Sequence, residues 1–147
     1  MTLEKAKNQA LKYLSYRPRT VWEVRIYLEK KKYDWEIINQ AIDYLKQLSY
    51  LDDEQFCRLW IESRIRLKPM GKKRLYAELV QKGISPDLIE QSLIENINDE
   101  LELSLARDLA VNKLIKIYEN KEKIINFLYR RGFAPELIFK VVEEIFS

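Results

Sequence analysis

One pattern of apolar residues occurs three times along the chain, and this repeat constrains the fold more than any other feature. The stretch 75–93, LYAELVQKGISPDLIEQSL, matches residues 24–42 at an offset of 51 and residues 124–142 at an offset of 49, without a gap. The apolar positions that coincide are Val24, Leu28, Tyr33, Ile38 and Ile42; Leu75, Leu79, Ile84, Ile89 and Leu93; and Ile124, Leu128, Phe133, Ile138 and Val142. Such self-similarity is typical of tandem copies of one supersecondary unit.

The composition favours helices. Hydrophobic residues make up 47% and charged residues 33% of the 147 positions, a balance that suits a folded chain and excludes a largely disordered one. Three glycines and four prolines leave little material for turns, so long helices are expected rather than many short strands. The single cysteine, Cys57, excludes an intramolecular disulfide and is expected to be a small core residue.

The first unit is predicted to hold three helices. Apolar residues at helical spacing indicate a first helix over 3–16, which ends before a proline. Thr20 followed by Glu23 is a capping box, in which each side chain accepts from a free backbone N–H, and it predicts a second helix from 21 to about 31. Asp34 is expected to cap a third helix that continues through Leu48.

The second unit repeats this design. A helix over 53–67 is interrupted by Pro69-Met70-Gly71, and the helix that follows is predicted to end at Gly83 in a left-handed conformation. Its apolar stripe leaves Lys73, Arg74, Ala77 and Gln81 facing outward. Ser85 and Pro86 then predict a capped third helix with proline in its first turn.

The third unit is predicted from the same signals. Its helices are expected over 99 to about 118, from 120 to 131 with Gly132 as the cap, and from 136 to 146 after Pro135.

The fold class predicted from this count is all-α, with three tandem three-helix repeats of helix-turn-helix type over 1–50, 51–98 and 99–147. Because each unit is small, we expect the units to stack so that one core runs through the chain, which makes the array elongated and curved. The alternative is a compact globule of nine helices.

Positive charge is unevenly distributed, although the net charge is only +3. The first fifty residues contain ten Lys and Arg against six Asp and Glu, whereas the other two units are nearly balanced. The densest basic window, 58–74, contains Glu62 as its only acidic residue. Its basic residues are Arg58, Arg64, Arg66, Lys68, Lys72, Lys73 and Arg74.

The residues that catalysis or metal binding usually requires are missing from the sequence. It has no histidine, and neither a glycine-rich phosphate loop nor a serine nucleophile motif can be identified. Asp52 and Asp53 fit helix capping better than metal binding, because carboxylates favour the positive end of a helix dipole. We therefore predict a binding protein that is not an enzyme and uses no cofactor, no metal and no small-molecule substrate.

The first residues are charged and amphipathic rather than continuously apolar, so neither a signal peptide nor a membrane span is predicted. A cytoplasmic location without a membrane partner is expected.

Several motifs together resemble the RecX family, the bacterial regulators of the RecA recombinase. They are YLDDEQFCRLWIESR at 50–64, GKKRLYAELVQKGI at 71–84, LYRRGFAPELI at 128–138, and Arg17-Pro18-Arg19-Thr20 with Trp22-Glu23. The resemblance covers about 10–142 in the family's order and spacing. It departs from the pattern at two turns, where Ser49 replaces a common glycine and Lys32-Tyr33 replaces a Lys-Gly pair.

The resemblance implies three tandem three-helix repeats, in agreement with the repeat found above. It also implies binding to the RecA filament on single-stranded DNA and inhibition of its ATPase and strand exchange, and so regulation of recombination, DNA repair and the SOS response. The RecA filament would be the main partner, and single-stranded DNA would bind weakly to the protein alone. An elongated body that contacts several protomers would combine weak contacts by effective concentration.

The candidate contact residues are mainly basic, because Lys and Arg contact phosphates and acidic surfaces. For each one the alternative is a solvated helix face, a favourable charge at a helix C-terminus or a structural ion pair. Trp22 lies off the apolar stripe of its helix and could stack on bases, whereas Trp35 and Trp60 are expected in the core. The candidates are Arg64, Arg66, Lys72, Lys73 and Arg74; Lys30, Lys31 and Lys32; Arg130 and Arg131; Arg17 and Arg19; and Trp22.

Two other functions are compatible with the sequence. A DNA-binding protein of helix-turn-helix type would bind DNA tightly on its own, with a steep dependence on salt. A helical-repeat scaffold for another protein would bind neither RecA nor DNA.

Overall fold

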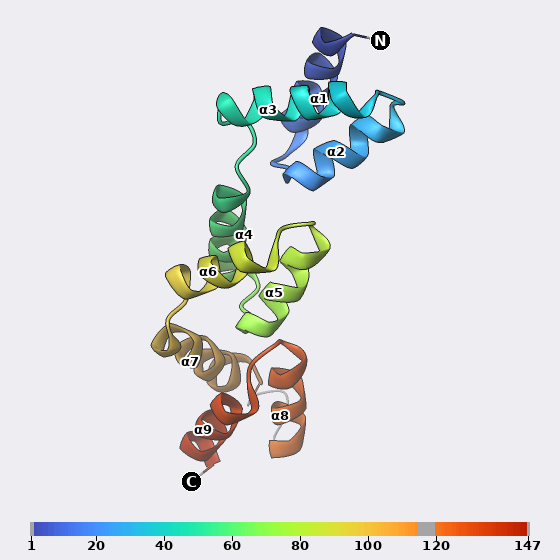
Figure 1. Ribbon diagram of the computed structural model, residues 1–147. Coiled ribbons are helices and arrows are strands. Elements are labelled where there is room, and N and C mark those ends of the chain that lie inside the picture. The colour runs from blue at the N-terminus through green and yellow to red at the C-terminus, as the bar shows by residue number, and fades with distance from the viewer. Residues whose placement is uncertain (1, 115–119, 147) are drawn as a thin grey trace.

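The computed structural model describes residues 2–114 and 120–146, and within these ranges the regular structure is entirely helical (Figure 1). The helices in order are α1 Leu3–Tyr16, α2 Val21–Lys30, α3 Trp35–Gln47, α4 Asp53–Leu67, α5 Lys72–Gln81, α6 Pro86–Asn96, α7 Asp99–Asp108, the π-helix η1 Leu109–Leu114, α8 Lys121–Arg130 and α9 Pro135–Phe146. The all-α prediction is confirmed.

The three units follow one another along an elongated, bent body with the two termini at opposite ends (Figure 1). The second helices α2, α5 and α8 lie on one side, and α6 and α9 lie on the other. The prediction of an extended array is confirmed, and the compact alternative is wrong.

Each unit has its own hydrophobic core, so the prediction of one core running through the chain is wrong. The first cluster of buried residues extends from Ala6 to Leu51, the second from Phe56 to Ile97, and the third from Ala106 to Val142. The repeated apolar stripe is enclosed within each unit, because the third helix of the unit packs against the first two. The unit bounds 1–50, 51–98 and 99–147 stay a prediction.

Most local signals produce the expected caps. Thr20 and Glu23 form both bonds of the capping box, and the hydroxyl of Ser85 accepts from the N–H of Leu88. Gly83 and Gly132 adopt the left-handed conformation, with φ of +80° and +89°. These predictions are confirmed because each depends on residues a few positions apart.

Two local predictions differ from the structure. Asp34 occupies the N-cap position of α3, but its side chain makes no capping hydrogen bond. The helix predicted over 99 to about 118 is α-helical only as far as Asp108 and continues as η1. The rest of that prediction, residues 115–119, lies outside the described residues.

At the two turns that depart from the family pattern, residues other than glycine adopt a left-handed backbone. Lys32 and Ser49 have φ of 70° and 63°. In the turn after α2 the left-handed residue is therefore Lys32 itself, whereas the next residue, Tyr33, is buried in the core. Lys32 occupies the position of Gly83 and Gly132 in the repeat.

Cys57 lies in the second core, as predicted, and is a free thiol. Burial and the nearby charge of Asp53 raise the pKa of its thiol to about 11.

Candidate nucleic-acid interface

Charge is segregated by helix position within the unit. The second-helix segments 20–32, 71–83 and 120–132 together contain twelve Lys and Arg and four Asp and Glu. The third-helix segments 34–48, 85–97 and 134–146 together contain two Lys and Arg and nine Asp and Glu. Since α2, α5 and α8 lie along one side of the molecule (Figure 1), that side is basic. Sequence reasoning missed this pattern, which becomes visible when the three copies are summed by helix.

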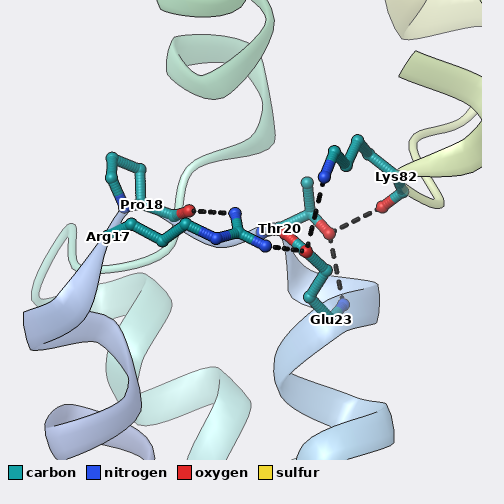
Figure 2. Close-up of polar contacts among 5 residues, drawn as sticks. All are labelled: Arg17, Pro18, Thr20, Glu23 and Lys82. Atoms are coloured by element: carbon teal, nitrogen blue, oxygen red, sulfur yellow. Dashed lines mark hydrogen bonds and ion pairs between the residues drawn. The ribbon is translucent and has the colours of Figure 1, made fainter. Parts of the chain in front are cut away.

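The second helices meet end to end, and we refer to α2, α5 and α8 together as the second-helix column. At the first junction the hydroxyl of Thr20, at the start of α2, donates to the carbonyl oxygen of Lys82, just after α5, at 2.7 Å (Figure 2). Trp22 lies against Gly83, where an added Cβ would overlap the indole. The positive end of one helix thus meets the negative end of the next.

The second junction uses the same ends of the next two helices, α5 and α8. The backbone N–H of Gly71 donates to the carbonyl of Arg131 at 2.8 Å, and that of Lys73 donates to the carbonyl of Gly132 at 3.2 Å. The guanidinium of Arg131 donates to the carbonyl of Pro69 at 2.8 Å. The column therefore continues through all three units.

A carboxylate from the following unit caps the second helix at each junction. Asp53 accepts from the N–H of Val21 at 3.0 Å, and Glu102 accepts from the N–H of Lys72 at 2.8 Å. Asp53 and Glu102 are equivalent positions of the repeat, 49 residues apart. Asp53 was predicted to serve its own helix, but Asp52 performs that role by accepting from Gln55. Burial raises the pKa of Asp53 despite its hydrogen bond from Val21.

Part of the densest basic window is neutralised by Glu78. Its carboxylate accepts from Arg64 Nε at 2.9 Å and from Trp60 Nε1 at 3.0 Å, and Arg74 Nε lies 4.0 Å away. Arg74 was predicted to face outward, but it is half-buried and packs against Gly132. Arg64 and Arg74 are thus partly committed to internal contacts.

The other members of the window differ in their freedom. Lys72 Nζ lies 3.4 Å from a carboxylate oxygen of Asp99. Arg66 and Lys73 are exposed, and their side chains have no ion pair among the described residues. Lys73 lies on the second-helix column, so it is the member best placed to contact a partner.

Most basic residues at the ends of the second helices are exposed to solvent. Lys30, Lys31 and Lys32 at the end of α2, and Arg130 at the end of α8, are exposed. Arg131 instead faces the second junction, where burial and the nearby charge of Arg74 lower the pKa of its guanidinium. The structure therefore separates Arg130 from Arg131, which the sequence treated as a pair.

Arg17 belongs to a structural ion pair, which the sequence offered as the alternative to a binding role. It donates to Glu23 at 2.8 Å and to the carbonyl of Pro18, while Lys82 Nζ lies 4.0 Å from Glu23 (Figure 2). Burial tends to raise the pKa of Glu23, but the hydrogen bonds from Arg17 and Thr20 and the charges of Arg17 and Lys82 outweigh it, so the pKa is lowered.

The remaining candidates lie on the first unit. The guanidinium of Arg19 stacks on Tyr13, 3.9 Å from the ring centre, and Tyr13 stacks on Tyr27. Trp22 is 46% exposed beside the first junction. Trp35 is 71% exposed, so the prediction that it lies in the core is wrong. It occupies the first position of α3, three residues before Ile38, where the buried stripe of that helix begins.

Within residues 2–114 and 120–146, no group of three or more His, Cys, Asp and Glu side chains could hold a metal ion. No helix of the described part of the chain is long and apolar enough to span a membrane.

Three-helix units joined end to end by their second helices define a helical-repeat protein. Residues 6–45 match the first three-helix domain of RecX, and residues 52–93 match the second. The chain belongs to the RecX family.

Individual relatives agree with this assignment. The chain is 37% identical over 142 residues to regulatory protein RecX of Lactobacillus johnsonii, covering 92% of this chain and 52% of that protein. It is 34% identical over 146 residues to regulatory protein RecX of Clostridium botulinum, and the match covers 95% of this chain and 68% of that protein. The crystal structure of RecX from Lactobacillus salivarius is 28% identical with a TM-score of 0.89, covering 97% of this chain and 96% of that chain. The chain thus spans about half to two thirds of the length of these curated relatives.

Proposed function

We propose that this protein binds the filament of RecA on single-stranded DNA and inhibits its ATPase and strand exchange. The observation that carries the proposal is the second-helix column, which joins basic segments of all three units on one side of an elongated body. Membership of a family of regulatory proteins supports the same role.

The mechanism follows from length and charge. Three basic segments spaced along one side contact successive phosphates or acidic protein groups, and their weak contacts add through effective concentration. A protein bound in this way along a filament blocks the approach of a second DNA strand. It also couples neighbouring protomers, which opposes the motions that ATP turnover requires.

The primary experiment measures the DNA-dependent ATPase of RecA while this protein is added. We expect strong inhibition at a molar excess, together with weak binding of single-stranded DNA by the protein alone. An ATPase rate unchanged by that excess contradicts the proposal. Tight DNA binding without RecA would support a stand-alone DNA-binding protein instead.

A charge-reversal pair tests the role of the second-helix column. The double variant Lys73→Glu, Arg130→Glu changes two exposed residues of the column. The matched control is Lys46→Glu, Lys140→Glu, which changes the net charge equally but lies on the third helices. We expect the column variant to need about ten times more protein for half-inhibition, with melting unchanged, because each lost phosphate contact weakens binding and its salt dependence. Equal effects of the two variants would show that net charge alone matters.

A further inference from the structure

A groove of about 510 Å³ lies where the first unit meets the second. It is lined by the end of α1, the loop that follows, the turn before α4, and α4 itself. Three large side chains on its wall are open to solvent: Tyr16 is 73% exposed, Tyr50 56% and Leu59 42%. Two tyrosine rings and a leucine side chain are therefore exposed to water in one groove.

The charges around the groove favour an anionic ligand. Arg19 lines it, and so does Arg17, whose charge is paired with Glu23. Lys12 is exposed one helical turn before Tyr16, on the same face of α1. Asp52 is the only carboxylate among the residues that line the groove, and it caps α4. The local positive charge suits a polyanion with flat apolar groups.

We propose that this groove binds unstacked bases of single-stranded nucleic acid, which stack on Tyr16 and Tyr50 while Lys12 attracts the adjoining phosphates. Aromatic platforms beside basic residues are the usual means of binding single strands without sequence preference, because every base has a flat face. The proposal rests on the proposed function, since it names where the single-stranded DNA of that function contacts this chain.

The second junction has no equivalent site. The positions that match Tyr16, Tyr50 and Leu59 in the next unit are Leu67, Asp99 and Asp108. A leucine and two carboxylates offer no aromatic platform and repel phosphates. The base-binding groove therefore occurs once in the described chain, at the first junction.

The experiment combines protein variants with altered DNA. Fluorescence anisotropy at low salt would measure binding of a labelled oligothymidylate, and of the same strand with several abasic positions, to the wild type and to Tyr16→Ala, Tyr50→Ala. Phe139→Ala is the matched control, since Phe139 is 61% exposed on α9, away from both the groove and the second-helix column. Circular dichroism and melting establish that each variant is folded.

We expect the double variant to bind the normal strand about fivefold more weakly or worse, because losing a stacked base has an effect of that size. Wild type and Phe139→Ala should discriminate against the abasic strand, and the double variant should not, since the two changes remove the same contact. Unchanged affinity, or equal discrimination by all three proteins, overturns the inference.

The ATPase measurement separates this inference from the proposed function. If wild type inhibits RecA and the double variant loses inhibition but keeps its DNA affinity, the groove holds a protein side chain and the base-stacking inference is wrong. If wild type fails to inhibit RecA, the proposed function fails, while the anisotropy comparison still decides the groove.

Discussion

The two junctions between units use equivalent helix ends but make contact in different ways. At the first junction the side chain of Thr20 reaches the carbonyl of Lys82. At the second, the equivalent residue is Gly71, and its backbone N–H bonds directly to the carbonyl of Arg131. An added Cβ at Gly71 would overlap the carbonyl of Gly132. The second junction is thus closer, and it depends on the absence of a side chain.

The glycines at the ends of the second helices show the same dependence on a neighbour. Gly83 and Gly132 each have a residue of the preceding unit, Trp22 and Arg74, pressed against the site where a Cβ would stand. Lys32 has the same left-handed backbone but lies in the first unit and is exposed. The comparison teaches that glycine is needed at this position for close packing as well as for positive φ.

The largest effect is expected at the closer junction. Gly71→Ala should lower the free energy of unfolding of the third unit by about 3 kcal/mol, because overpacking at a backbone contact forces the units apart. All three tryptophans lie within residues 1–60, so fluorescence follows the first two units and circular dichroism follows the whole chain. In urea, helix loss should therefore begin before the fluorescence change. Coincident transitions at the wild-type midpoint would contradict the difference between the junctions.

The next effect separates packing from backbone conformation. Gly83→Ala should lower the free energy of unfolding by about 2 kcal/mol, because it places an alanine in the left-handed conformation and its Cβ overlaps Trp22. Lys32→Gly, at the equivalent position, should leave stability unchanged or raise it by up to about 1 kcal/mol. Urea denaturation followed by tryptophan fluorescence measures both. A loss in Gly83→Ala no larger than the gain in Lys32→Gly would show that packing against Trp22 is unimportant.

A smaller effect is expected from the side-chain contact of the first junction. Thr20→Ala removes both the cap of α2 and the bond to Lys82, and should cost about 1 kcal/mol. Thr20→Ser keeps the hydroxyl and is the matched control. If alanine and serine are equally stable, the hydroxyl does not hold the junction.

The smallest effect is a difference in pH dependence between two carboxylates of the first junction. The pKa of Glu23 is lowered in the folded protein, so its stabilisation is present above its ordinary value of 4.5 and is lost as pH falls through the folded value. The pKa of Asp53 is raised, so its contribution is present below its ordinary value of 3.8 and is lost as pH rises through the folded value.

Melting temperatures of Glu23→Gln and Asp53→Asn between acid and neutral pH test these signs. Glu23→Gln should be less stable than wild type at neutral pH, with the gap closing in acid. Asp53→Asn should gain relative to wild type as the pH rises. If the melting temperatures of both variants change with pH in parallel with the wild type, the opposite pKa shifts of Glu23 and Asp53 are contradicted.

Much of the fold could be predicted because its signals are local. The capping box at Thr20 and the glycine caps involve residues within one or two turns, and the helical period assigns the core stripe. The candidate site could be predicted only as a set of basic residues. Arg64 and Arg74 meet Glu78, and Lys72 meets Asp99 from the next unit, so these partners depend on how helices pack. Lys73 and Arg130 are equally basic in the sequence, but helix packing leaves their side chains exposed.

The amino-acid sequence by itself determined that there are three helical units and where most helices begin and end, because short-range hydrogen bonds and apolar periodicity act within each segment. Only the tertiary structure decided that the units keep separate cores, that α2, α5 and α8 join end to end, and that Tyr16 and Tyr50 line one groove. These features depend on contacts between residues about fifty positions apart, whose geometry follows from the crossing of whole helices rather than from local preference.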